Sequence, residues 1–236
     1  MAEPGPLLAV RDLNAFYGES HVLHGIDLDV AGGQVVTLLG RNGAGKTTTL
    51  RAIMGLTDRP TGSVAFRGAE ILGLKPYEIG RKGIAYCPEE RGIFATLSTE
   101  ENLLLPPVLH EGGMSTEEVY ALFPNLLERR RSAGTKLSGG EQQMLAIGRI
   151  LRTGANLLLL DEPTEGLAPV IVELIGKALR QLKARGYTIL LVEQNIDFAS
   201  AISDVHYVIE NGAVVDRLDN DGLKADLARL DEYLAV

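Results

Sequence analysis

The apolar residues of the chain follow two different strand patterns. Residues 25–30, GIDLDV, alternate apolar and acidic side chains, as a strand with one buried face does, and end at an AGG turn. Three later runs do not alternate: QVVTLLG at 34–40, LLLLD at 157–161 and TILLVEQ at 188–194. Continuous apolar runs of this length are typical of strands buried on both faces of a parallel sheet. The sequence therefore predicts an open α/β sheet.

Helical patterns separate these buried strands. KTTTLRAIMG follows the first of them, and PVIVELIGKALRQLKARG precedes the third. The stretch from about residue 98 to 153 is also predicted to be helical, because STEE at 98–101 and again at 115–118 has the spacing of a capping box. The expected organisation is a single domain, 1–236, in which a helical subdomain, 89–153, is inserted into an α/β core, 1–88 and 154–236.

Two further patterns lie near the C-terminus. Asn211 and Gly212 stand between two β-rich runs, which predicts a tight hairpin. The leucines at 223, 227, 230 and 234 fall on one face of an amphipathic helix, which we expect to pack on the core.

Composition and charge narrow the function classes. The 236 residues are 45% hydrophobic and 23% charged, as in globular proteins, and the net charge of -8 argues against nucleic acid as a partner. The chain opens without a signal-peptide pattern, and its longest apolar runs are too short to span a bilayer, so any membrane role should be peripheral. The single cysteine, Cys87, is expected to be a buried small apolar residue, and with the four histidines it gives no zinc-site spacing.

Residues 40–47, GRNGAGKT, match the P-loop pattern and lie between a buried strand and a helix. In such a loop the glycines let backbone N–H groups surround phosphates at the positive end of the helix. Lys46 is expected to reach the β- and γ-phosphates of a nucleotide, and the Thr47 hydroxyl to ligate Mg²⁺. The expected nucleotide-binding residues are Gly40, Asn42, Gly43, Ala44, Gly45, Lys46, Thr47 and Thr48.

A second element supplies carboxylates for a metal ion. LLLLDEP at 157–163 ends a buried strand with Asp161 and Glu162, and ligands bind at the C-terminal ends of strands in open α/β sheets. We expect Asp161 to hold Mg²⁺, commonly through water, and Glu162 to polarise an attacking water. The P-loop upstream argues against the alternative, two solvated acids at a strand end.

The seven residues LSGGEQQ, 137–143, precede another apolar helical pattern. On their own they are explained by helix capping, with Ser138 as the N-cap and Glu141 completing a capping box. Two adjacent glycines also allow another molecule to approach the backbone closely. The P-loop and the DE pair leave kinases, GTPases, helicases and transport ATPases open, and LSGGEQQ decides among them. Together with GRNGAGKTT and LLLLDEPT in the same order, it makes the chain resemble the ATP-binding cassette (ABC) ATPases over essentially its whole length.

This resemblance implies a P-loop core with an N-terminal antiparallel β subdomain and an inserted helical subdomain. In the family, two cassettes pack head to tail, and each LSGGEQQ-type signature loop caps the γ-phosphate of the ATP held by the other chain. Ser138 and the N–H groups of Gly139 and Gly140 are thus implied to bind a partner's nucleotide, while Glu141 and Gln142 support the loop.

The chain has one cassette and no long coiled coil, so it resembles the motor subunit of a transporter whose channel is a separate protein. YCPEERGIF, DEPTEGLAP and LLVEQN are similar to an ATPase subunit of branched-chain amino acid importers, and urea or amide importers are a close alternative. The implied partners are membrane permease subunits, a second ATPase (sister chain or self) and, indirectly, a solute-binding protein. The implied location is the cytoplasmic face of the membrane. A soluble ABC factor without a channel and a small-molecule kinase are the rival classes.

Four positions bear on how such a site would work. Tyr17, in AFYG, stands where the family stacks an aromatic on adenine, and a core tyrosine is the alternative. Glu89 stands in place of a metal-ligating glutamine, and Gln194 in place of a histidine that contacts the γ-phosphate. Ala168 replaces an aspartate that bonds across the dimer. These departures raise the alternative of an impaired site, whereas Lys46, Thr47, Asp161 and Glu162 favour a working one.

Overall fold

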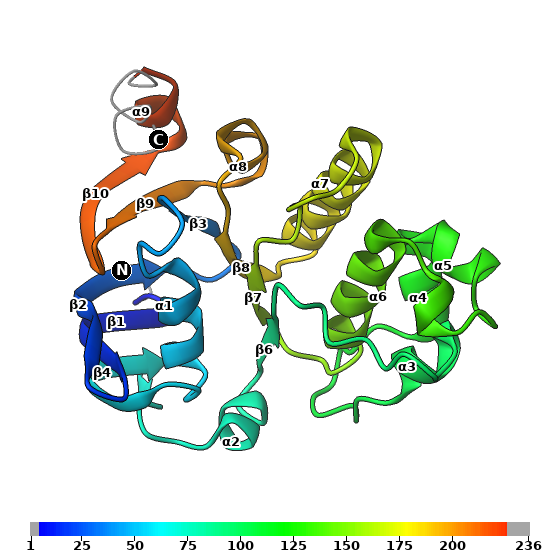
Figure 1. The fold of residues 1–236 in the computed structure, drawn as a ribbon, viewed down its shortest axis with the longest axis horizontal. Coiled ribbons are helices and arrows are strands. Elements are labelled where there is room, and N and C mark those ends of the chain that lie inside the picture. Colours follow the sequence, from blue (N-terminus) through cyan, green and yellow to red (C-terminus); the bar gives the residue numbers. More distant parts are fainter. Residues whose placement is uncertain (1–4, 226–236) are drawn as a thin grey trace.

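The computed structural model describes residues 5–225, which form two β-sheets with helices packed around them (Figure 1). Within this range the larger sheet has six strands in the order β10-β9-β3-β8-β7-β6. The strands from β9 to β6 run parallel, and β10 is antiparallel to β9. Their bounds are β3 Val35–Leu39, β6 Ile84–Cys87, β7 Leu157–Asp161, β8 Thr188–Val192, β9 Val205–Glu210 and β10 Ala213–Asp219. The three predicted buried strands are β3, β7 and β8, and the predicted α/β class is confirmed.

Every residue of β3, β7 and β8 is buried, because each of these strands is covered on both faces. Successive side chains of β7 therefore enter different cores. Leu157 and Leu159 pack in a core that includes α1 (Lys46–Ile53) and the smaller sheet, whereas Leu158 and Leu160 pack against α6 (Gly139–Leu151) and α7 (Pro169–Ala184). This period of two explains why the sequence shows a continuous apolar run.

The smaller sheet is antiparallel and has the strand order β2-β1-β4-β5. It lies beside α1, on the side of the molecule away from α3–α6 (Figure 1). The predicted strand at 25–30 is the C-terminal part of β2, whereas the sequence pattern does not predict β1 or β4. The bounds are β1 Leu8–Tyr17, β2 Ser20–Val30, β4 Asp58–Phe66 and β5 Ala69–Glu70.

Short helices fill the chain between β6 and β7 and gather on one side of the molecule (Figure 1). The two STEE segments start helices as predicted: Ser98 and Ser115 are N-caps whose side chains accept hydrogen bonds from Glu101 N and Glu118 N. These helices are α3 Thr99–Leu104, α4 Thr116–Leu122, α5 Pro124–Glu128 and a 3-10 turn, Gly134–Lys136, followed by α6. Elsewhere the chain forms α2 Pro76–Gly80, α8 Ile196–Ile202 and α9 Asn220–Ala225.

The C-terminal hairpin forms where it was predicted. Asn211 and Gly212 have φ angles of 47° and 77°, which is the backbone conformation that an Asn-Gly turn supplies in a two-residue hairpin. Leu223 is buried beside β9 and α8. The leucines expected to continue its helical face, at 227, 230 and 234, lie outside the described residues.

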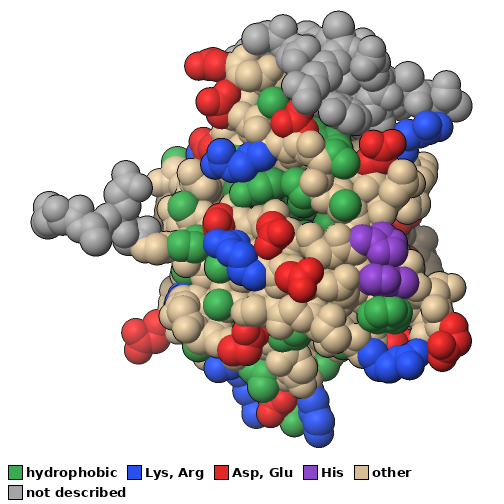
Figure 2. Space-filling view, turned by 90° about the vertical axis from the view of Figure 1, so that its left-hand side faces the viewer, with side chains coloured by type: hydrophobic (Ala, Val, Ile, Leu, Met, Phe, Trp, Pro, Cys, Tyr) green, Lys and Arg blue, Asp and Glu red, His purple; other side chains and the backbone are tan. Residues whose placement is uncertain are grey.

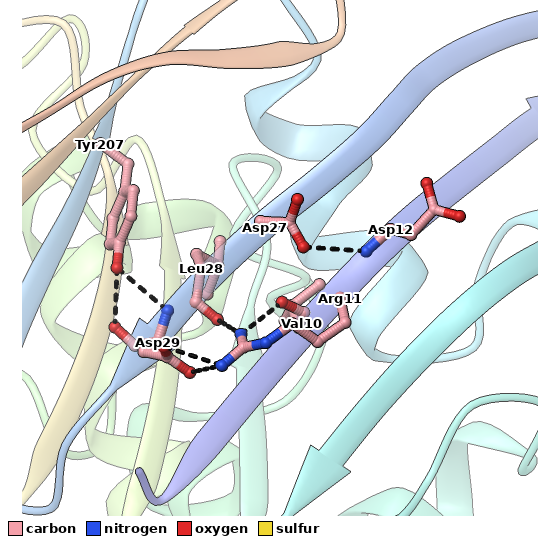
Figure 3. Close-up of polar contacts among 7 residues, drawn as sticks. All are labelled: Val10, Arg11, Asp12, Asp27, Leu28, Asp29 and Tyr207. Carbon is pink, nitrogen blue, oxygen red and sulfur yellow. Dashed lines mark hydrogen bonds and ion pairs between the residues drawn. The ribbon is translucent and has the colours of Figure 1, made fainter.

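A tyrosine fastens the two sheets together. The Tyr207 hydroxyl, from β9, accepts a hydrogen bond from Asp29 N at 3.0 Å and donates one to Asp29 O at 3.3 Å. Asp29 lies on β2, and both of its carboxylate oxygens accept hydrogen bonds from Nη2 of Arg11 on β1, at 2.8 and 2.9 Å (Figure 3). The three residues thus connect the larger sheet to the edge of the smaller one.

The remaining expectations concern surfaces and metals. The face shown in Figure 2 carries Asp and Glu side chains interspersed with Lys and Arg. Cys87 is buried and free, as expected. Among residues 5–225, no cluster of three His, Cys, Asp or Glu residues could hold a metal ion, and no helix is long and apolar enough to cross a membrane.

Candidate functional site

The P-loop crosses from β3 to α1, and two of its glycines, Gly40 and Gly45, lie close against other parts of the chain. Gly40 has a φ angle of 151°, and a Cβ atom there would lie 2.2 Å from the carbonyl oxygen of Ile209, so only glycine fits. Lys46, the first residue of α1, is 4% exposed. Its ammonium donates hydrogen bonds to the carbonyl oxygens of Gly40 at 2.9 Å and Arg41 at 3.0 Å. The loop therefore curls around a buried cation.

Asp161 ends β7 beside the start of α1, as the sequence predicted, and is 1% exposed. Its Oδ1 accepts a hydrogen bond from the Thr47 hydroxyl, and its Oδ2 accepts one from the Tyr86 hydroxyl, each at 2.8 Å. Burial raises the pKa of Asp161, although these two hydrogen bonds oppose the rise. Burial and the charge of Asp161 in turn raise the pKa of Tyr86.

Glu162 brings three predicted site residues together. Its backbone has a φ angle of 45°, a strained value that is rare for a residue with a side chain and that turns the chain sharply after β7. One carboxylate oxygen lies 3.5 Å from the Lys46 ammonium, and the other accepts a hydrogen bond of 2.8 Å from the Gln194 amide. The same Gln194 nitrogen lies 2.7 Å from the side-chain oxygen of Asn42. Lys46, Asn42, Glu162 and Gln194 thus form one polar cluster.

A cavity of about 420 Å³ opens over this cluster. Three carboxylates line it together with the ammonium of Lys46, and one of them, Glu165, was not singled out in the sequence. A hydrogen bond with Glu162, followed by burial and the charge of Glu162, raises the pKa of Glu165 to about 7. The lining residues are Val22, Asn42, Gly43, Gly45, Lys46, Thr47, Thr48, Glu89, Glu162 and Glu165.

Tyr17 ends β1 and is 39% exposed, so it is not the buried core tyrosine that was the alternative. It does not line the 420 Å³ cavity. Arg51, in the last turn of α1, interacts with the hydroxyls of Tyr86 and Tyr17, which raise the pKa of its guanidinium, and it pairs with Glu90 at 3.3 Å. Arg51 therefore connects Tyr17 with the tyrosine that contacts Asp161.

The LSGGEQQ segment starts α6 with the predicted capping box. Glu141 N donates to Ser138 Oγ at 3.3 Å, and the Glu141 carboxylate accepts from Ser138 N at 2.7 Å. The Gln142 side chain donates to the carbonyl oxygens of Gly134 and Leu137, which holds the preceding loop. The segment does not line the cavity around Lys46.

The two glycines of this segment have different surroundings. A Cβ atom on Gly140 would lie 2.7 Å from Cγ2 and 3.0 Å from Cγ1 of Ile171 on α7, which is closer than packed atoms approach. A Cβ atom on Gly139 would lie 3.2 Å from the flexible end of the Arg91 side chain and in ordinary contact, 3.6 Å, with Leu167. The close packing of α6 on α7 therefore requires a glycine at position 140. At position 139 packing does not require a glycine, so the lack of a side chain there keeps the start of α6 accessible. Ala168, the N-cap of α7, is exposed and provides no side-chain cap.

The site has the chemistry of a phosphate and divalent-cation site. Hydroxyl and carboxylate oxygens are the ligands that Mg²⁺ prefers, and Thr47 and Asp161 place two of them 2.8 Å apart. Glu89 lines the same cavity as Thr47, so the three predicted metal ligands lie around one region. The donor set fits a magnesium ion.

Comparison with known proteins also indicates an ATP-binding protein. A family model described as ABC transporter matches residues 23–165. The chain is 42% identical to the high-affinity branched-chain amino acid transport ATP-binding protein BraG of Pseudomonas aeruginosa, over 89% of this chain and 91% of that protein. It is 40% identical to the probable branched-chain amino acid transport ATP-binding protein LivF of Archaeoglobus fulgidus, over 88% and 90%. The lipopolysaccharide export system ATP-binding protein LptB of Escherichia coli K12 is 31% identical, over 88% of each chain.

Solved structures share the fold. A nucleotide-free ATP-binding cassette from an ABC transporter superposes with a TM-score of 0.82 at 26% identity, covering 94% of this chain and 95% of that one. The dimeric structure of a bacterial ABC transporter cassette superposes with a TM-score of 0.79 at 26% identity, covering 90% and 98%.

Proposed function

The chain belongs to the ABC transporter family of ATP-binding proteins, and we propose that it is the ATP-hydrolysing subunit of an importer for branched-chain amino acids. The observation that carries the ATPase part is the cluster formed by Lys46, Asn42, Glu162 and Gln194 beside Asp161. The amino acid is supported by relatives: BraG and LivF are 42% and 40% identical to the chain, against 31% for LptB.

The phosphates of ATP bind in the 420 Å³ cavity, where they take over the Lys46 ammonium from the carbonyl oxygens of Gly40 and Arg41. Gly43, Gly45, Lys46, Thr47 and Thr48 line this cavity at the start of α1, where the N–H groups and the dipole of a helix N-terminus favour negative charge. The exposed ring of Tyr17 stacks on the adenine.

Thr47, Asp161 and Glu89 hold Mg²⁺, which neutralises charge on the β- and γ-phosphates when bound. The Thr47 hydroxyl and Asp161 are already paired, and Glu89 replaces an amide with a carboxylate. Glu89 therefore keeps an oxygen ligand but adds negative charge to a cavity that also contains Glu162 and Glu165.

Glu162 polarises the attacking water. The Lys46 ammonium at 3.5 Å and the Gln194 amide at 2.8 Å hold its carboxylate in place. Gln194 also donates to the γ-phosphate, and as an amide it does so at any pH but without positive charge. The contacts of Gln194 with Glu162 and Asn42 support a working site rather than an impaired one.

The signature loop acts on a second cassette. ABC cassettes work as dimers with membrane permease components. Ser138 and the N–H groups of Gly139 and Gly140, at the positive end of α6, bind the γ-phosphate held by the partner's P-loop. Ala168 contributes no side-chain hydrogen bond across this dimer. The partner is a sister ATPase or a second copy of the chain.

The permease contact lies on the helical side of the molecule. A cavity of about 340 Å³ between β6 and α6 is lined by apolar side chains such as Leu109 and Ile150, together with Arg91 and Arg149. It has room for a helix end of the permease. The chain thus sits peripherally on the cytoplasmic face of the membrane and responds, through the permease, to a solute-binding protein.

The proposed function is tested first by light scattering on purified Glu162→Gln with and without Mg-ATP. Blocking hydrolysis is expected to trap a closed dimer, while the matched control Glu128→Gln, at an exposed position of α5, hydrolyses ATP like the wild type. A variant that binds ATP but stays monomeric would show that the chain needs a sister subunit. Loss of ATP binding or retained ATPase activity in Glu162→Gln would overturn the assigned chemistry.

The solute is tested by co-expressing the chain with permease subunits encoded beside it and measuring uptake into membrane vesicles from those cells. Uptake of labelled leucine that depends on ATP is expected, and unlabelled isoleucine and valine should compete. Uptake of urea or amides instead would assign the chain to the alternative importer class.

A further inference from the structure

We propose that Tyr86 is a positioning residue that holds the carboxylate of Asp161 in the orientation needed to bind Mg²⁺. This rests on the proposed nucleotide site but concerns a residue that neither the P-loop nor the DEP segment contains.

The register of two parallel strands places the two side chains together. Tyr86 on β6 is paired with Leu159 on β7, so Asp161 lies two residues further along the same face. That diagonal separation is within reach of a tyrosine side chain. The observed hydrogen bond from the phenol to Asp161 Oδ2, at 2.8 Å, uses this reach.

Two donors fix the carboxylate, and they differ in what metal binding does to them. Thr47 donates to Oδ1 from the start of α1 and is itself a proposed metal ligand, so metal binding would engage the same hydroxyl. Tyr86 donates to Oδ2 from the neighbouring strand and has no ligand role. The Tyr86 contact is therefore the one that keeps the rotation of the buried carboxylate fixed while the metal is exchanged.

The phenol is itself held on its other side. The guanidinium of Arg51 interacts with the Tyr86 hydroxyl and also pairs with Glu90 at 3.3 Å. A phenol that lies against Arg51 and donates to Asp161 has charged groups on two sides, which suits an outer residue that orients a metal ligand. Tyr86 also lines the 340 Å³ cavity between β6 and α6.

The test is Tyr86→Phe, which removes the hydroxyl and keeps the ring. Binding of a fluorescent ATP analogue is measured in EDTA and then at increasing free Mg²⁺. We expect affinity for the metal-free nucleotide to stay within about twofold, whereas half-maximal Mg²⁺ rises about 10-fold or more. Mn²⁺ electron paramagnetic resonance with a non-hydrolysable ATP analogue should show the same loss without any dependence on turnover.

Tyr120→Phe is the matched control, because the hydroxyl of Tyr120 is buried in α4 without a hydrogen-bond partner. It should leave both the Mg²⁺ midpoint and nucleotide affinity unchanged. An unchanged Mg²⁺ midpoint in Tyr86→Phe, or an equal loss of metal-free nucleotide binding, would overturn the inference. Wild-type protein that does not bind the nucleotide would refute the proposed function instead.

If Tyr86→Phe does not fold, Arg51→Met replaces it. Removing the guanidinium removes its interaction with the Tyr86 hydroxyl, so the Mg²⁺ midpoint should rise at least about twofold. A midpoint equal to that of the wild type would refute the positioning role.

Discussion

Replacing each glycine of the LSGGEQQ segment by alanine separates packing from nucleotide binding. At Gly140 the new methyl group would lie 2.7 Å from one carbon of Ile171 and 3.0 Å from another. Both carbons are bonded to the branch point of the Ile171 side chain, which packs against the core formed with α6 and α7. Overpacking of this kind costs about 1–3 kcal/mol. In a chain of this size that lowers Tm by roughly 2–12 °C.

At Gly139 the same substitution should be tolerated. The nearest atom is the flexible end of Arg91 at 3.2 Å, and alanine is favoured over glycine in a helix by up to about 1 kcal/mol. Gly139→Ala is thus expected to match or exceed the wild-type Tm, and any loss of ATPase activity in it reports on the approach of the partner's nucleotide.

Differential scanning calorimetry of the four proteins Gly139→Ala, Gly140→Ala, Ile171→Ala and Gly140→Ala/Ile171→Ala completes the test. Ile171→Ala removes all three carbons within 3.3 Å of the new methyl group, so the double variant should be more stable than the sum of the two single effects predicts. If Gly140→Ala is as stable as Gly139→Ala, or if the two effects simply add, the packing explanation of Gly140 is wrong.

Three further predictions follow from the site and the core. Gln194→His places near Glu162 a ring that can carry a positive charge. Turnover equal to or below that of the wild type is expected, and a large gain would show that the native site is impaired. The pKa of Glu165 is raised, so its contribution to stability is full below pH 4.5 and is lost as pH rises through about 7. The Tm of Glu165→Gln, measured from pH 4 to 9, should equal that of the wild type at low pH and exceed it slightly above pH 7. Equal Tm values for the two proteins at pH 8 would contradict this. His206 is fully buried, and burial lowers its pKa, so its contribution to stability is present above pH 6.5 and is lost as pH falls through the lowered pKa. In His206→Gln, Tm should therefore fall less steeply below pH 6.5 than in the wild type. An unchanged fall in Tm would exclude His206 as its cause.

The local patterns of the sequence were sufficient for the parallel core and the helix starts. Leu157–Asp161 is buried throughout because both faces of its strand are covered, which a continuous apolar run indicates directly. Ser98 and Ser115 cap helices through contacts three residues away, so their information is also local. The position of the P-loop between β3 and α1, and of the DE pair at the end of β7, follows from local patterns in the same way.

Contacts that depend on strand register could not be predicted. Tyr86 reaches Asp161 only because Tyr86 pairs with Leu159 across two strands that are about 70 residues apart in the sequence. Glu165 joins the cavity through the turn after Glu162, whose positive φ angle no sequence pattern indicates. The strand β1 was missed because bulges at Val10–Leu13 and beyond interrupt its alternation. Its partner β4 contains a proline and a glycine, which weaken a strand pattern.

The hydrogen bonds between Tyr207 and Asp29 limit self-association of the protein at high concentration. β2 is an outer strand of the antiparallel sheet, and an outer strand with free N–H and C=O groups is a template on which another chain can add a strand. Tyr207 occupies both backbone groups of Asp29, and His24 N is bonded to the carbonyl oxygen of Gly212, so the hairpin of β9 and β10 covers this border at two places. The protein's own hairpin thus blocks self-association through the β2 edge.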